Sequence, residues 1–307
     1  MVLFNIFIIK YLPENEFNSY IFVFTISVFI VSVVSTLSNT TIITSKIDIE
    51  DASLLLILQI SIVTVFYTFC NLFKYYFEDL LIYCCLFSIT QILLLYNITH
   101  YQRLLNFRKV YKIEFIKSFI ILTSIVIIHY YFKNINAKDI LLIQIISCLL
   151  PVLIFSKSTF RLSFKKIINK LKNLLSSLFK QNYGNLAFYY LILAMISSVD
   201  VLFLKLFGSE HDLSVYGSAL RIYAIISLTL QSIQKVLLPK VAKQDLIKDI
   251  NSYYKELSIT SLIVLFPILL VIYLMSDILY LIFNDKFLNY ENVFRILLAS
   301  AFFSFIF

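Results

Sequence analysis

The sequence predicts an all-α protein that crosses a membrane several times. Apolar residues make up 60% of the 307-residue chain and charged residues 14%, and the mean hydropathy is +0.89. Soluble domains are about half apolar and about a quarter charged, so a soluble core could not bury this much apolar surface. Several apolar runs reach about 20 residues, the length of a spanning helix. The chain has three glycines and four prolines, too few for the many turns of a membrane β-barrel.

Ten apolar runs follow one another, and we expect about ten transmembrane segments. The first, Met1–Leu12, and the last, Val293–Phe307, are shorter than a crossing requires, so we expect both to be partial and the chain to be truncated, mainly at its C-terminal end. No small-residue cleavage site follows Met1–Leu12, so it is not interpreted as a signal peptide. The other runs are Phe17–Thr44, Ala52–Phe73, Leu80–Ile98, Ile113–Phe132, Ile140–Ser156, Tyr183–Phe207, Leu213–Pro239 and Leu257–Phe283.

A basic, polar stretch at 157–182 divides the chain. Between Phe164 and Leu178 its apolar residues recur at helical spacing, and lysines occupy the other face. Such a helix lies in the membrane interface with its basic face toward anionic head groups; the alternative is that it only connects two bundles. The sequence therefore predicts an N-terminal bundle of about six helices at 1–156, a basic cytoplasmic connector at 157–182, and an incomplete C-terminal bundle at 183–307.

The distribution of lysine and arginine predicts the orientation. If the runs alternate across the membrane, most basic residues fall on one side, and positive charge marks the cytoplasmic side. The N-terminus is therefore predicted to be cytoplasmic, and the net charge of +8 reflects topology rather than nucleic-acid binding. The basic side holds Lys46, Arg103, Arg108, Lys109, Lys112, Lys117, seven residues of 157–182, Lys235, Lys240, Lys243, Lys248 and Lys255, and the other side holds Lys10, Lys74, Lys133, Lys138, Lys205 and Lys286.

One short pattern occurs twice. "ENEFNSY" at Glu14–Tyr20 and "EHDLSVY" at Glu210–Tyr216 share two acids, a large apolar residue and a tyrosine at matching positions. Six predicted spans separate the copies, so both are expected in outer loops. Weak similarity between halves is typical of transporter folds. We interpret the copies as matching outer loops of two related bundles.

Two ionisable residues lie within predicted spans and are the candidate binding residues. Asp200 precedes the end of the seventh run by about seven residues, and Arg221 lies about eight residues into the eighth. Each is therefore about 10 Å from the outer end of its helix. Charges at such depth usually face a bundle interior or a cavity. Arg221 is predicted to hold an anionic substrate group and Asp200 to orient it or to couple ions; the alternative is a structural ion pair between neighbouring helices.

The sequence offers no catalytic or metal site. Cys70, Cys84, Cys85 and Cys148 lie in or beside apolar runs without metal-ligand spacing, so they are interpreted as buried thiols. The sequence has no paired-carboxylate motif and its predicted outer loops are short, so we do not expect an enzyme. We expect no cofactor and no metal.

The segment "SSVDVLFLKLFGSEHDLSVYGSALRIYAIISLTLQSIQKVLLPKVAK" resembles the polysaccharide transporters of the multidrug/oligosaccharidyl-lipid/polysaccharide exporter superfamily, and in particular the O-antigen flippases. The shared features are an Asp near the end of helix seven, a glycine-bearing loop, a Tyr, an Ala-rich start to helix eight and a Leu-Pro exit. Here these are Asp200, Gly208, Tyr216, Ala219 and Leu238–Pro239. "LPENEFNSY" and "HYQRLLNFRKVYK" resemble the family's first outer loop and a basic cytoplasmic loop. The family typically has twelve helices in two six-helix bundles, and by this comparison the chain is expected to lack most of helix ten and all of helices eleven and twelve.

The resemblance implies a function and its setting. It implies a flippase that moves polyprenyl-pyrophosphate-linked oligosaccharide, an O-antigen or capsule repeat unit, across the bacterial inner membrane by alternating access. A polysaccharide polymerase and a chain-length regulator are then candidate partners, besides membrane lipids. Two alternatives are a cation or drug antiporter of the same fold, which predicts cavity acids in the N-terminal half, and an integral membrane polysaccharide polymerase.

Overall fold

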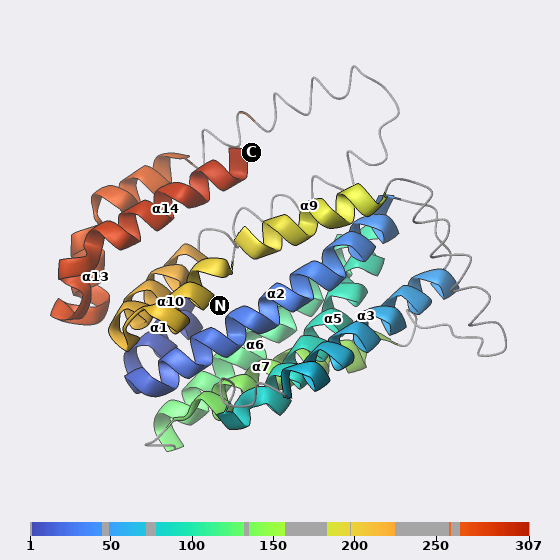
Figure 1. Cartoon of the computed structure of the whole chain (residues 1–307), viewed down its shortest axis with the longest axis horizontal. Coiled ribbons are helices and arrows are strands. Elements are labelled where there is room, and N and C mark those ends of the chain that lie inside the picture. The colour runs from blue at the N-terminus through green and yellow to red at the C-terminus, as the bar shows by residue number, and fades with distance from the viewer. Residues whose placement is uncertain are drawn as a thin grey trace. The chain divides into compact units, whose positions relative to one another are not determined.

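The computed structural model describes residues 2–44, 49–71, 78–131, 135–156, 183–196, 198–224, 258 and 265–306 (Figure 1). These residues form helices and short connections, with no strand among them, so the all-α prediction is confirmed. Four of the described helices are long and apolar enough to cross a membrane, at Glu14–Thr36, Glu50–Cys70, Leu81–Arg103 and Ala137–Phe155. The expected ten spans are therefore not reproduced in this part of the chain.

The chain divides into two compact units. One contains Met1–Asn18 and Phe207–Phe307, and the other contains Ser19–Leu206. The predicted connector at 157–182 lies outside the described residues, as do most of the predicted eighth run and the start of the ninth. The predicted division into two related bundles therefore stays a prediction.

Long helices build the unit of Ser19–Leu206. Helix α2 (Glu14–Thr44) contributes its residues from Ser19 onward to this unit. Four further long helices lie beside α2 (Figure 1): α3 (Ile49–Cys70), α5 (Leu81–Arg103), α6 (Phe107–Tyr131) and α7 (Ala137–Phe155). The short 3-10 helix η2 (Glu78–Leu80) precedes α5. Each helix overlaps a predicted apolar run, and their ends agree within about six residues. The apolar length of each run therefore located these helices correctly.

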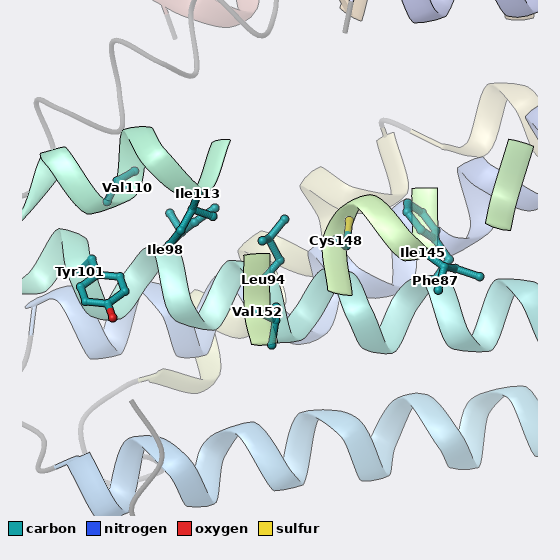
Figure 2. Packing of buried hydrophobic residues seen from close by; sticks show 9 residues of the cluster. All are labelled: Phe87, Leu94, Ile98, Tyr101, Val110, Ile113, Ile145, Cys148 and Val152. Atoms are coloured by element: carbon teal, nitrogen blue, oxygen red, sulfur yellow. The ribbon is translucent and has the colours of Figure 1, made fainter. Parts of the chain in front are cut away.

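Helix α5 lies between its neighbours and packs against α3, α6 and α7. Along α5, Phe87, Leu94, Ile98 and Tyr101 are buried at spacings of seven, four and three residues, which places them on one helical face. Residues of α6 and α7 complete this cluster (Figure 2). The Tyr101 hydroxyl donates to the carbonyl oxygen of Phe155 at 3.0 Å, and so joins the ends of α5 and α7.

A tight turn joins α5 to α6. Leu105 has φ of 52°, the left-handed conformation. The backbone N–H of Leu105 donates to Gln102 O at 2.9 Å, and that of Asn106 donates to Tyr101 O at 2.9 Å. This pair of bonds is the Schellman arrangement that closes a helix C-terminus. Asn106 Oδ1 then accepts from the N–H of Lys109 at 3.3 Å, which caps the start of α6.

The predicted seventh run is not one helix. It forms α9 (Tyr183–Ile196) and α10 (Val199–Phe207), and Ser198 lies in a turn between them. The Ser198 N–H donates to Met195 O at 3.1 Å, a bond of the tighter 3-10 type. Two serines and one aspartate are the only polar residues near this point of the run. They lower the average hydropathy too little to reveal the break.

The other unit combines both ends of the described chain. It contains α1 (Val2–Tyr11), the first turn of α2, a helical stretch at 210–224, a helical stretch at 265–273, α13 (Met275–Phe283), the 3-10 helix η5 (Asn284–Tyr290) and α14 (Glu291–Ile306). Helix α13 packs against η5 and α14. Arg295, near the start of the predicted last run, pairs with Glu291 at 3.4 Å and donates to the hydroxyl of Ser276 at 3.2 Å.

Candidate functional site

Arg221 lies on the helical stretch 210–224, about 16 Å along the helix from Glu210. Its side chain is buried, with 7% of the residue exposed. The side-chain amide of Asn5, on α1, donates to the backbone carbonyl oxygen of Arg221 at 3.2 Å. Asn5 is itself buried. The structure thus holds a guanidinium inside an apolar helical unit and fixes its backbone to α1.

Ser209 and Asp212 cap the helix that carries Arg221. The Ser209 hydroxyl accepts from the Asp212 N–H at 3.1 Å, and Asp212 Oδ2 accepts from the Ser209 N–H at the same distance. This reciprocal pair is a capping box in which aspartate replaces the usual glutamate or glutamine. The Ser209 hydroxyl and N–H lower the pKa of Asp212. The cap fixes the point at which the helix begins, and so the position of Arg221 along it.

The two copies of the repeated pattern contact each other. His211 Nδ1 lies 3.3 Å from Glu14 Oε1, and the Asn18 amide donates to Glu210 O at 3.0 Å. His211 Nε2 also lies 3.2 Å from the hydroxyl of Tyr290. We call Glu14, Asn18, Glu210, His211 and Tyr290 the clasp. The sequence predicts two similar loops, but nothing in either segment predicts that they contact each other.

Both copies are helix starts rather than loops. The N–H of Phe17 donates to Pro13 O at 2.8 Å, and the N–H of Leu213 donates to Ser209 O at 3.2 Å. Phe17 and Leu213 occupy matching positions in the pattern, and both are buried. The acids stand in the first turn, where the helix dipole favours negative charge. The pattern therefore encodes the same local structure twice: an acidic first turn with one buried apolar anchor.

Asp200 lies at the break between α9 and α10. It is in the first turn of α10, and its Oδ1 accepts from the N–H of Val201 at 2.9 Å. A shallow groove of about 460 Å³ runs beside it. The groove is lined by Ile192, Met195, Ile196, Val199, Asp200 and Phe203. Asp200 thus brings the single carboxylate to an otherwise apolar lining.

Asp200 and Arg221 belong to different units, since Asp200 lies within Ser19–Leu206 and Arg221 within Phe207–Phe307. Their pairing across neighbouring helices therefore stays a prediction.

A row of buried polar contacts crosses the unit of Ser19–Leu206. The Tyr67 hydroxyl of α3 lies 3.1 Å from the Ser27 hydroxyl of α2 and 2.9 Å from the Ser88 hydroxyl of α5. Gln144 of α7 donates to the Tyr20 hydroxyl of α2 at 2.8 Å. Hydrogen bonds of this kind hold helices together inside a membrane. Hydropathy did not reveal these residues because single serine, tyrosine and glutamine residues leave the average over a long apolar run high.

Lys117 is a second buried cation. Its position in the sequence suggested a basic loop, but it lies on α6, ten residues after the helix begins, with 9% of the residue exposed. It interacts electrostatically with the thiol of Cys148 on α7. Lys117 therefore differs from the exposed basic residues with which the sequence grouped it.

Among the described residues, no group of three or more His, Cys, Asp or Glu side chains could hold a metal ion.

No family model, curated protein or solved structure matches the chain.

Proposed function

We propose that the chain belongs to a flippase for polyprenyl-pyrophosphate-linked oligosaccharide. The observation that carries this proposal is the burial of Arg221 in an apolar helical unit. A guanidinium can grip a phosphate through two parallel hydrogen bonds, and buried charges in membrane proteins usually serve a substrate path. The capping box and Asn5 support the proposal because they fix the helix that presents Arg221.

The proposal includes the finer architecture. Two related bundles, about ten spans with partial terminal ones, and a cytoplasmic N-terminus in a bacterial inner membrane would allow alternating access to a central site. A polymerase and a chain-length regulator would act on the translocated repeat unit. The four apolar helices among the described residues support membrane insertion as such.

A translocation assay in cells that lack their own flippase tests the role of Arg221. Arg221→Ala should reduce transport strongly, about a hundredfold if a charged hydrogen-bonded contact worth roughly 3 kcal/mol is lost. Arg221→Lys should retain part of the activity because it keeps the charge but loses the planar fork. Arg295→Ala is the matched control, since it removes an arginine that is paired within its own helix. Normal transport by Arg221→Ala at normal membrane abundance would contradict the proposal.

The groove beside Asp200 favours a second candidate, export of lipophilic cations. A carboxylate against an apolar lining suits an organic cation with an apolar body. Efflux of tetraphenylphosphonium from whole cells separates the candidates. If the protein is a cation exporter, Asp200→Asn should abolish efflux and Arg221→Ala should not. If it is the flippase proposed above, neither variant should change the efflux of this cation.

A further inference from the structure

One face of α6 is an exposed stripe of large apolar side chains. Tyr111, Phe115 and Phe119 are 70%, 56% and 56% exposed, and Leu122, Val126 and Tyr130 continue the series. The rings of Tyr111 and Phe115 lie 6.2 Å apart between centroids, and those of Phe115 and Phe119 lie 6.3 Å apart. At about 100° per residue these six positions fall within about a third of the helix circumference. We call them the α6 stripe.

The opposite face of α6 is buried against its own unit. Val110, Ile113, Lys117 and Ile121 are all at most 9% exposed, and α6 packs against α5 and α7. Helix α6 therefore has two apolar faces, of which one is occupied by protein. A continuous apolar stripe of this size is unusual on a surface that faces water.

The dimensions of the α6 stripe match a bilayer. From Tyr111 to Tyr130 the helix rises about 28 Å, close to the roughly 30 Å thickness of the hydrocarbon core. Tyrosines stand at both ends, where the interfacial aromatic belts of spanning helices lie. Helix α6 is outside the four helices selected above by length and composition, so this match is an additional observation.

The base of the α6 stripe is basic. Arg108 and Lys112 lie one helical turn apart and on the same face as Tyr111 and Phe115, and both are exposed. Neither makes an ion pair with another described residue. Lys109, between them in sequence, is turned toward its own unit, with its ammonium 4.7 Å from the centre of the Tyr101 ring. Arg108 and Lys112, which form no ion pair with another described residue, thus lie beside an exposed apolar stripe long enough to cross the hydrocarbon core.

We propose that the base of α6 is a binding site for an anionic phospholipid. Its phosphate head group would lie against Arg108 and Lys112, and its acyl chains would lie along Tyr111, Phe115 and the rest of the α6 stripe. The apolar stripe suits the acyl chains of any phospholipid, and the two cations at its base favour an anionic head group over a neutral one. The proposal does not depend on what the protein transports.

Tryptophan quenching in lipid nanodiscs tests the site. The chain has no tryptophan, so Phe115→Trp places a single reporter in the α6 stripe, with Tyr111→Trp as a second reporter if the first disturbs folding. The full chain is placed in phosphatidylcholine that contains a small fraction of brominated phosphatidylglycerol or, separately, brominated phosphatidylcholine. Brominated phosphatidylglycerol should quench well beyond its mole fraction. Brominated phosphatidylcholine should quench only in proportion to its own.

A charge-matched pair of variants isolates the two cations. Each basic residue near an anionic lipid surface contributes about fivefold in affinity, so Arg108→Gln/Lys112→Gln should weaken the preference for phosphatidylglycerol about thirtyfold at low salt. It should leave quenching by phosphatidylcholine unchanged. Lys10→Gln/Lys138→Gln removes the same charge from exposed Lys10 and half-buried Lys138, which lie outside the α6 stripe, and should preserve the preference.

Three outcomes would overturn the proposal. Equal quenching by both lipids in the parent would exclude a head-group site. The absence of quenching by either lipid would mean that protein covers the α6 stripe, either residues 157–182 or a second copy of the chain. If Lys10→Gln/Lys138→Gln lost the preference for phosphatidylglycerol as much as Arg108→Gln/Lys112→Gln does, the preference would depend on the overall charge of the protein and not on a site.

Discussion

His211 contacts side chains that are 197 and 79 positions away in the sequence. Because both partners are exposed, the Glu14 contact should be weak: a double-mutant cycle with Glu14→Gln and His211→Ala should give a coupling of about 0.2–1 kcal/mol. Chemical unfolding in detergent micelles measures it. A coupling of zero would mean that the contact between Glu14 and His211 does not stabilise the fold.

Asp212 makes the start of the Arg221 helix sensitive to acid. Its pKa is lowered in the folded state, so the capping contribution is complete above the unfolded-state pKa and is lost as the pH falls through the folded value. Asp212→Asn should therefore destabilise the protein at neutral pH and have progressively less effect in acid. Thermal unfolding at several pH values tests this prediction. Glu210→Gln is the control, because it removes a neighbouring charge without removing a bond to Ser209. The same pH dependence in Glu210→Gln would contradict the assignment of the acid sensitivity to the Asp212 cap.

Leu105 occupies a backbone conformation that suits glycine. A side chain in the left-handed region costs about 1–2 kcal/mol, whereas glycine adopts it freely. Since the Leu105 side chain is partly exposed, Leu105→Gly should stabilise the protein by about 0.5–1 kcal/mol after the greater entropy of unfolded glycine is subtracted. Leu104→Gly is the control: Leu104 has φ of −78°, and glycine there should destabilise. If both variants destabilise, packing of the Leu105 side chain outweighs its backbone strain.

At the scale of elements, hydropathy predicts membrane helices well and their interruptions poorly. The run from Tyr183 to Phe207 is mostly apolar, yet α9 ends at Ile196. The break depends on local hydrogen bonds, from the Ser198 N–H to Met195 O and from the Val201 N–H to the Asp200 carboxylate, which a hydropathy average does not measure. The α5–α6 turn is similar: three residues sufficed where a longer basic loop was expected, because a Schellman closure and the Asn106 cap need only local bonds.

At the scale of the whole molecule, the repeated pattern was visible in the sequence but its purpose was not. The shared acids and apolar anchors indicate a common origin or a common local structure, and both copies are indeed capped or acidic helix starts. Their contact depends on the chain bringing residues 14–18 and 207–224 into one unit. No periodicity within either segment contains that information. Arg221 is a similar case. Its place in a long apolar run predicts a buried side chain, but the run does not predict that Asn5, 216 positions away, donates to its carbonyl oxygen.

The orientation of the chain is the remaining prediction at this scale, and it rests on the positive-inside rule. In a variant without Cys70, Cys84, Cys85 and Cys148, we expect Glu210→Cys, at the clasp, to react from outside the cell with a membrane-impermeant maleimide. Leu104→Cys, in the basic α5–α6 turn, should react only after the cells are opened. Both positions are exposed, so access of the reagent is limited by the membrane and not by packing. The reverse labelling pattern would invert the topology, and would move the proposed lipid site at Arg108 and Lys112 to the outer leaflet.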